Sequence, residues 1–240
     1  MQKTIHFYSP VHFERWDWRN SVEKGIGGSE TAHTELAWRF ARRGYKVMSY
    51  APIPEDCTGE WRGTSWYRLE DADFKAPGIW VFFRSTVEIN KLEKQPGQQW
   101  WLDLQDEGCT GAITQETAEK LDLVFAFCDW HRKHIERTWP VLRGKIVVTS
   151  NGVKVDLIRE LEKSGKPERN PKKLIYASSP DRGLLTLLKI FPRAKEIVPD
   201  IELHCFYGVN NIEALIEFNP RLEEHDSGPR FLDYLVRPAR

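Results

Sequence analysis

A glycine cluster that opens directly into a helix constrains the fold of this chain more than any other feature. The cluster occupies residues 25–28, and apolar residues then recur at helical spacing over residues 32–41. Gly44 follows this run and is typical of the residue just beyond a helix. Apolar runs at residues 4–8 and 46–50 flank the segment and predict strands. Strand, glycine turn, helix and strand form a βαβ unit, which predicts a parallel sheet with ligands at the carboxyl ends of its strands.

The glycine cluster suits the binding of an anion. Small residues let a phosphate approach the backbone, and the start of the helix offers free N–H groups and the positive end of the helix dipole. Ser29 stands where an N-cap is expected, and capping alone would also explain a serine there. A tight turn without a ligand is the other interpretation of the glycines. The long preceding segment favours binding, because Trp16, Asp17 and Trp18 are more recognition-type side chains than a plain connection needs.

Charge and cysteine content exclude several classes of protein. Lys and Arg together number 35, as do Asp and Glu, so the formal charge is zero and a general nucleic-acid binder is not expected. The four cysteines show no paired ligand spacing, which predicts reduced thiols in a cytoplasmic protein. His131 and His134 are one helical turn apart, but no carboxylate or cysteine accompanies them at suitable spacing, so no metal site is predicted. The chain enters a predicted strand at once, so no cleaved signal is expected. No apolar run approaches the roughly 20 residues of a membrane span.

Further apolar runs extend the predicted sheet. Strands are expected at 78–83, 99–106, 123–128 and 145–150, with helices at 115–120 and from Asp129 onward. Residues 51–78 are rich in Pro, Gly, Asp and Glu and are expected to be an irregular excursion with one short strand at 66–69. Arg84 directly follows a predicted strand, which puts a positive side chain at that strand's carboxyl end. The Arg84 side chain either binds a ligand or forms an ion pair at the surface.

The strand and helix pattern restarts after a charged segment. Residues 154–171 are heavily charged and carry Gly and Pro, which predicts a helix followed by an interdomain linker. A strand is then expected at 173–179, a turn at 180–183, an apolar helix from 184 to 191 and a strand at 201–208. We therefore predict an α/β protein with one domain over residues 1–153, the linker over 154–171 and a second, partial domain over 172–240.

Several short motifs occur in an order that resembles the GT-B glycosyltransferases, most of all glycosyltransferase family 4. They lie between about residues 4 and 208 and are Gly27-Gly28-Ser29-Glu30, Gln105-Asp106, Cys128-Asp129-Trp130-His131, Ser150-Asn151-Gly152-Val153 and the segment 176–183. The resemblance implies a GT-B-like fold, with a complete N-terminal Rossmann-like domain on the acceptor side and a partial Rossmann-like domain on the donor side.

The same resemblance implies transfer of a sugar from a nucleotide-sugar donor, UDP- or GDP-linked, to a hydroxyl acceptor. Transfer would proceed with retention and without a metal or other cofactor. Carried over by position, the catalytic residues would be Gln105 and Asp106. The donor diphosphate would be held by Gly27, Gly28, Ser29, Ser178, Ser179, Arg182 and Gly183. The acceptor side would be formed by Trp16, Asp17 and Arg84. Two positions depart from the family pattern, since Gln105 replaces a histidine and Ser178 replaces an arginine.

The partial second domain carries its own expectations. In the family this domain continues to a Glu-x7-Glu pair that holds the donor sugar and ribose, so we expect this chain to bind donor weakly and to turn it over slowly or not at all. An exposed strand edge predicts self-association into a homo-oligomer, and peripheral membrane contact is expected if the acceptor is a lipid.

Two other functions stay open at the level of the sequence. The first is a non-catalytic, truncated GT-B fold that binds a sugar or nucleotide, or that a partner chain completes. The second is a dinucleotide-dependent oxidoreductase, which requires a GxGxxG fingerprint and an acidic residue at the end of the second strand. Here the glycine spacing differs, and that strand runs into Tyr50, Ala51 and Pro52.

Overall fold

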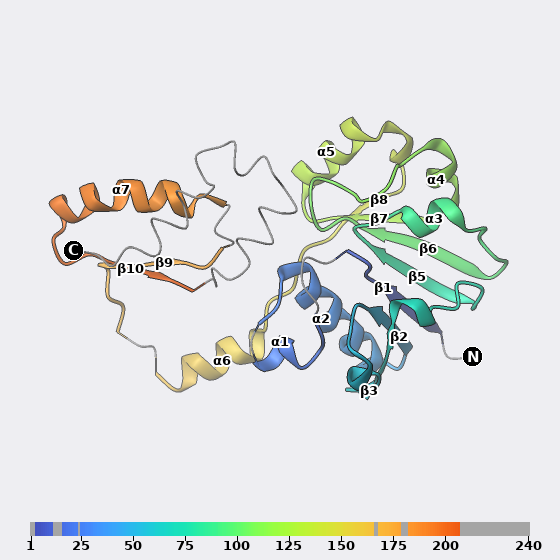
Figure 1. Ribbon diagram of the computed structural model, residues 1–240, viewed down its shortest axis with the longest axis horizontal. Helices are drawn as coiled ribbons and strands as arrows, with labels where there is room; N and C mark the ends of the chain where they lie inside the picture. Colours follow the sequence, from blue (N-terminus) through green and yellow to red (C-terminus); the bar gives the residue numbers. More distant parts are fainter. Residues whose placement is uncertain (1–2, 12–15, 24, 166–167, 179–181, 207–240) are drawn as a thin grey trace. The chain divides into compact units, whose positions relative to one another are not determined.

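The chain forms two compact units, Met1–Val153 and Lys154–Arg240. A computed structural model describes residues 3–11, 16–23, 25–165, 168–178 and 182–206 (Figure 1). Among the expected site residues, Ser179 lies outside the described part.

The first unit is built on an eight-stranded sheet in the order β3-β4-β2-β1-β5-β6-β7-β8. The strands are β1 (Thr4–Tyr8), β2 (Lys46–Ala51), β3 (Gly59–Trp61), β4 (Thr64–Arg68), β5 (Gly78–Phe83), β6 (Gln98–Asp103), β7 (Leu123–Ala126) and β8 (Ile146–Val148). All neighbouring strands are parallel except β3 and β4. This is an α/β fold of the general Rossmann-like kind, which confirms the predicted α/β class.

The strand order defines where a ligand binds in a sheet of this type. From β1 the chain steps outward to β2 and β4, and it then returns to the other side of β1 for β5, β6, β7 and β8. The order therefore reverses between β1 and β5. Open parallel sheets bind ligands outside the carboxyl ends of their strands at such a switch point. Here that point lies beyond Tyr8 of β1 and Phe83 of β5.

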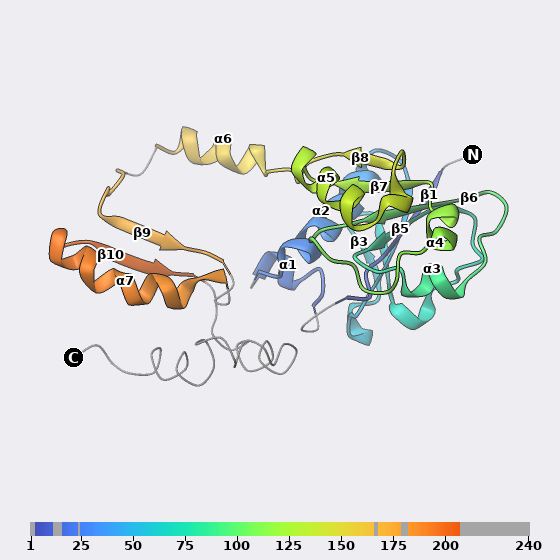
Figure 2. The same ribbon diagram turned by 90° about the horizontal axis from the view of Figure 1, so that it is seen from above.

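Helices cover both faces of the sheet (Figures 1 and 2). Successive residues of a strand point to opposite faces, and both faces of this sheet carry apolar side chains that the helices bury. The helices of this unit are α1 (Asn20–Glu23), α2 (Gly28–Arg42), α3 (Val87–Lys91), α4 (Gln115–Lys120) and α5 (Asp129–Thr138). One buried cluster joins Phe7, Val81 and Phe83 to Ala37 of α2. The other joins strand residues such as Trp80 and Phe82 to α3, α4 and α5 through Ile89, Ala118 and Ile135.

Most predicted elements are present, with shorter strand ends than expected. Strand 78–83 and helix 115–120 match β5 and α4 to the residue. The expected strand over 99–106 ends at Asp103, because the chain leaves the ladder for the polar loop that follows.

Two local expectations were wrong. The short strand expected at 66–69 corresponds to β4, but residues 51–78 are more regular than predicted, since β3 pairs with β4 in an antiparallel hairpin at the edge of the sheet. Its two-residue turn, Arg62-Gly63, has φ values of 52° and 76°, as a tight hairpin requires. Ser29 is not the N-cap of α2, because the helix starts one residue earlier than the serine and Gly27 occupies the capping position.

A buried histidine on α2 makes the stability of this unit depend on pH. His33 is fully buried, stacks on Phe83 and Trp66 with ring centroids 4.8 and 5.6 Å apart, and lies 2.5 Å from the Ser49 hydroxyl through Nε2. Burial lowers the pKa of His33 to about 3. Since the unfolded chain binds a proton near pH 6.5 and the folded chain does not, stability is lost as the pH falls below about 6.5.

We expect His33→Phe to reduce the fall in the free energy of unfolding at acidic pH. Between pH 7.5 and 5.5, His33 alone should lower the free energy of unfolding by about 1.4 kcal/mol. Urea unfolding at both pH values should therefore show a pH-dependent loss smaller by about this amount in the variant. Asp103 also titrates in this range, because burial raises its pKa to about 6. Its protonation stabilises the folded chain as the pH falls, and this effect is the same in both proteins, so it cancels when their losses are compared. Equal losses in the two proteins would refute the assignment.

The second unit contains a strand, helix and strand of its own. Helix α6 (Val155–Lys163) comes first, followed by β9 (Lys173–Tyr176), α7 (Leu184–Ile197) and β10 (Glu202–Cys205). β9 and β10 pair in parallel, so the predicted order of elements after residue 172 is confirmed. None of the helices in the described part of the chain combines the length and hydrophobicity that a membrane span requires.

Candidate functional site

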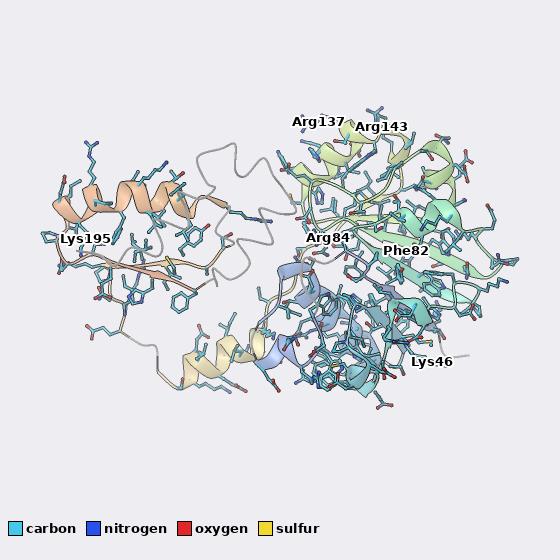
Figure 3. The ribbon with its side chains drawn as sticks, in the orientation of Figure 1. Lys46, Phe82, Arg84, Arg137, Arg143 and Lys195 are labelled. Atoms are coloured by element: carbon cyan, nitrogen blue, oxygen red, sulfur yellow. The ribbon has the colours of Figure 1, made fainter. Side chains whose placement is uncertain are left out.

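The candidate site lies at the carboxyl edge of the large sheet, beside the switch point. Helix α2 begins there at Gly28, and the loops that follow β5 and β6 carry Arg84 and Asp106. Figure 3 shows Arg84 beyond the end of β5, the strand that carries Phe82. We call Ser29, Glu30, Arg84 and Asp106 the switch-point cluster.

Arg84 is the centre of this cluster. Its Nη2 lies 2.7 Å from Asp106 Oδ2, its Nη1 donates to Ser29 Oγ at 2.9 Å, and Nη1 is 3.9 Å from Glu30 Oε1. Only 14% of the side chain is exposed. The guanidinium thus joins the loop after β5, the loop after β6 and the first turn of α2.

The backbone of Arg84 is strained and firmly held. Its φ is 58°, in the left-handed region that a side chain with a Cβ seldom adopts. The Arg84 N–H donates to the Asp103 carbonyl at 2.9 Å, and the Arg84 carbonyl accepts from the Thr110 N–H at 2.8 Å. Strain of this kind costs of order 1–3 kcal/mol and is concentrated at functional sites. The two hydrogen bonds keep the guanidinium at one position at the sheet edge.

The first turn of α2 contributes a buried carboxylate as well as its N–H groups. Glu30 is the third helical residue, and its carboxylate turns back over the capping residue. A Cβ added to Gly27 would lie 2.1 Å from Glu30 Oε2. Ser29 Oγ also donates to this carboxylate at 3.1 Å. A negative group at this position is stabilised by the helix dipole. At Gly28 a Cβ would meet nothing within 4 Å, so that side of the turn is open.

The two glycines should respond differently to alanine. Gly27→Ala forces the Glu30 carboxylate away from the helix start and replaces a tolerated N-cap residue by a poor one. We expect a loss of about 1–2 kcal/mol in the free energy of unfolding. Gly28→Ala has space for its methyl group and improves helix propensity, so it should be neutral or stabilising by up to about 1 kcal/mol. Denaturant unfolding of both variants measures the difference, and equal effects would contradict the placement of Glu30.

His131 of α5 holds the loop that carries Asp106. Its Nδ1 accepts from the Phe127 N–H at 3.3 Å, which leaves Nε2 as the protonated nitrogen that donates to the Asp106 carbonyl at 3.1 Å. Burial lowers the pKa of His131, which favours this neutral form. His134, one helical turn further along α5, points its Nε2 at the Glu107 carbonyl, 3.1 Å away. No group of three or more His, Cys, Asp or Glu residues within the described ranges could hold a metal ion.

Asp103 and Gln105 form a second polar pair beneath the loop. Gln105 Nε2 donates to Asp103 Oδ2 at 2.8 Å. Burial raises the pKa of Asp103 to about 6. Of the two residues expected to be catalytic, the structure places Asp106 in the switch-point cluster and turns Gln105 toward Asp103.

The two other acceptor-side candidates are packed into the first unit. Trp16 is 2% exposed and lies against His33 and Trp66. Asp17 accepts hydrogen bonds from the N–H groups of Arg19 and Asn20. Burial raises the pKa of Asp17, but hydrogen bonds from Arg19 and Asn20 outweigh this and lower it overall. Both residues have structural roles here, and their contact with an acceptor stays a prediction.

The donor-side candidates of the second unit lie around the start of α7. Ser178 follows β9 and is partly exposed, Arg182 is exposed, and Gly183 has φ 106° at the N-cap of α7. A left-handed capping residue explains the glycine by backbone geometry. The roles of these residues toward a diphosphate stay predictions.

Sequence reasoning assigned no role to Glu30, Asp103 or His131. Glu30 could have been found, since an acidic residue three positions after an N-cap commonly turns back to the helix start. In the comparisons with known proteins, no family model and no curated protein sequence matches this chain.

Proposed function

We propose that this chain is a glycosyltransferase-like protein that transfers a sugar from a nucleotide-sugar donor to a hydroxyl acceptor. The observation that carries the proposal is the meeting of Arg84, Ser29 and Asp106 at the switch point of a Rossmann-like sheet. The ordered motifs that resemble glycosyltransferase family 4 support the reaction type. The proposal includes a GT-B arrangement of two Rossmann-like units, and Arg182 and Gly183 are the proposed diphosphate-binding residues of the second unit.

In the proposed reaction the first unit contributes electrostatic stabilisation of the leaving group. When the glycosidic bond to the diphosphate breaks, negative charge grows on the departing phosphate. A fixed guanidinium and the N–H groups of the first turn of α2 stabilise that charge without reorganising during the reaction. Arg84 is suited to this role because it is always charged and can bind two phosphate oxygens at once.

Asp106 competes with the ligand for the same guanidinium. The Asp106 carboxylate is 43% exposed and lies 2.7 Å from Arg84 Nη2, where a phosphate oxygen would bind. Binding of the diphosphate therefore exchanges one anion for another and frees the Asp106 carboxylate at the reaction centre, where it orients the acceptor hydroxyl.

Asp106→Asn should separate binding from turnover. Removing the competing charge is expected to tighten the binding of UDP or GDP by about three- to tenfold, which corresponds to ~0.7–1.4 kcal/mol, the range of a typical hydrogen bond. Sugar transfer should fall at the same time, because the freed carboxylate is missing. Isothermal titration with UDP and GDP, together with a transfer assay, measures both. Weaker nucleotide binding in the variant would argue against competition at Arg84.

A donor panel tests the function itself. The full chain is incubated with UDP- and GDP-linked hexoses and a mixture of simple hydroxyl acceptors, and release of the nucleoside diphosphate is followed by chromatography. Release that depends on acceptor and is lost in Arg84→Gln supports the proposal. Binding of nucleoside diphosphate without release favours the non-catalytic binding module. Absence of both binding and release overturns both functions.

A further inference from the structure

A second concentration of positive charge lies at the other end of α2. Arg39, Arg42, Arg43 and Lys46 fall within eight residues, and residues 36–54 contain no Asp or Glu. The chain as a whole is neutral, so this is a local separation of charge. The nearest acidic side chain on the helix is Glu35, which pairs with Arg39 at 3.1 Å.

Three of the guanidiniums in this region are stacked around a single indole. The Cζ atoms of Arg39, Arg42 and Arg62 lie 4.8, 5.0 and 5.5 Å from the ring centroid of Trp38. Each cation is attracted to the ring by about 0.5–1 kcal/mol at an exposed site. The same geometry holds three like charges close together, and their mutual repulsion is relieved when an anion binds among them.

Arg62 reaches this position at a cost in backbone energy. It occupies the hairpin turn between β3 and β4 with φ 52°, where Asn or Gly is the favoured residue. Its guanidinium lies 4.5 Å from the ring centroid of Trp61 as well as over Trp38. The turn itself packs on α2, since a Cβ at Gly63 would lie 3.4 Å from the Ala41 Cβ. Residues with a strained backbone, such as Arg62, are concentrated at functional sites.

A cavity lies beside three arginines of this region, Arg39, Arg42 and Arg43. It has a volume of about 440 Å³ and is lined by Leu36, Arg39, Phe40, Arg42 and Arg43. This volume is within the range of small-molecule sites, and the lining combines two apolar side chains with three guanidiniums, of which that of Arg39 already pairs with Glu35. We call it the arginine pocket.

We propose that the arginine pocket binds a small molecule that carries two or more phosphate groups. A diphosphate matches several guanidiniums, because each can donate two parallel N–H bonds to one phosphate. The pocket is separate from the switch-point cluster. Arg42 is 13 residues along α2 from Ser29, which is about 20 Å at 1.5 Å per residue. The inference therefore does not depend on the proposed sugar transfer.

Inorganic pyrophosphate is the probe for this site. It is titrated into the full-length Arg84→Gln variant by isothermal calorimetry at low salt, so that the switch-point cluster is already disabled. We expect one pyrophosphate to bind per chain. Adding Arg42→Gln and Arg43→Gln should weaken binding at least tenfold. The matched control adds Lys133→Gln and Arg137→Gln on α5, which removes the same charge from another exposed helix and should change binding less than twofold.

Three results would overturn the proposal. They are no binding to the Arg84→Gln variant, equal weakening by the control pair, or binding to vesicles of anionic phospholipid without binding of soluble pyrophosphate. Near-ultraviolet circular dichroism verifies the fold of each variant. If the double replacement unfolds the chain, Arg43→Gln alone decides, because Arg43 lines the pocket but is not among the arginines stacked on Trp38. It should then weaken binding at least threefold.

Discussion

Arg84→Gln is expected to lower nucleoside-diphosphate binding by about 10- to 100-fold and to reduce sugar transfer by about 100-fold. The guanidinium bridges Ser29, Glu30 and Asp106 at the switch point. A charge-assisted hydrogen bond to phosphate contributes roughly 1.5–3 kcal/mol, which corresponds to this range of affinity. Glutamine keeps a polar side chain with one N–H₂ donor, but it is two atoms shorter and provides neither the charge nor a second donor nitrogen.

The control for this variant is Arg143→Gln. Arg143 is an exposed arginine of the same unit that follows the short 3-10 helix Pro140–Leu142 (Figure 3), so its loss changes the net charge equally. It should leave binding and transfer within about twofold of the unmodified chain. Titration with UDP and GDP at two salt concentrations separates a local effect from general charge loss. An Arg84→Gln variant that binds both nucleotides as tightly as the unmodified chain would remove the basis for the proposed site.

Trp80→Ala is expected to cost about 3–5 kcal/mol in the free energy of unfolding, within the range of large-to-small core substitutions. Trp80 is fully buried, and its ring stacks on His6 with centroids 4.2 Å apart and contacts Phe74 at 5.0 Å. Its indole N–H donates to the Ala76 carbonyl at 3.0 Å. The substitution removes this bond and leaves a cavity at the centre of the sheet. Small proteins are stable by only about 5–15 kcal/mol, so this loss is a large fraction of the free energy of unfolding.

Trp130→Ala is the matched substitution at the surface. Trp130 is 55% exposed and stacks on His134 alone among the ring contacts of the described residues. We expect a change of at most about 0.5 kcal/mol. Urea unfolding monitored by far-ultraviolet circular dichroism compares the two variants. Similar losses would contradict the assignment of Trp80 to the core.

The pattern of the sequence predicted the parts of the fold that depend on local periodicity. The apolar run 78–83 is β5, because a strand buried on both faces needs no alternation. The β3–β4 hairpin was missed, because its strands are short and its turn uses Arg62 in a conformation that arginine seldom adopts. The same region therefore looked like an irregular loop rich in turn-forming residues.

The candidate site was predictable only in part. Parallel strands end at the same edge of a sheet, so Arg84 after β5 and Asp106 after β6 could be expected near each other. The reversed carboxylate of Glu30 and the link from His131 to the Asp106 carbonyl depend on packing between elements far apart in sequence. Periodicity contains no information on such contacts.

The central claim is that a nucleoside diphosphate binds at the start of α2 beside Arg84. Amide chemical shifts of the deuterated full chain, recorded during titration with UDP and GDP, test this most directly. The account predicts the largest shifts at Gly28, Ser29 and Arg84 of the unmodified chain, and it predicts that Gly28 and Ser29 of the Arg84→Gln variant shift only at about 10- to 100-fold higher nucleotide concentration. Shifts that leave these three amides in place while others move, or no shifts at millimolar nucleotide, would contradict it.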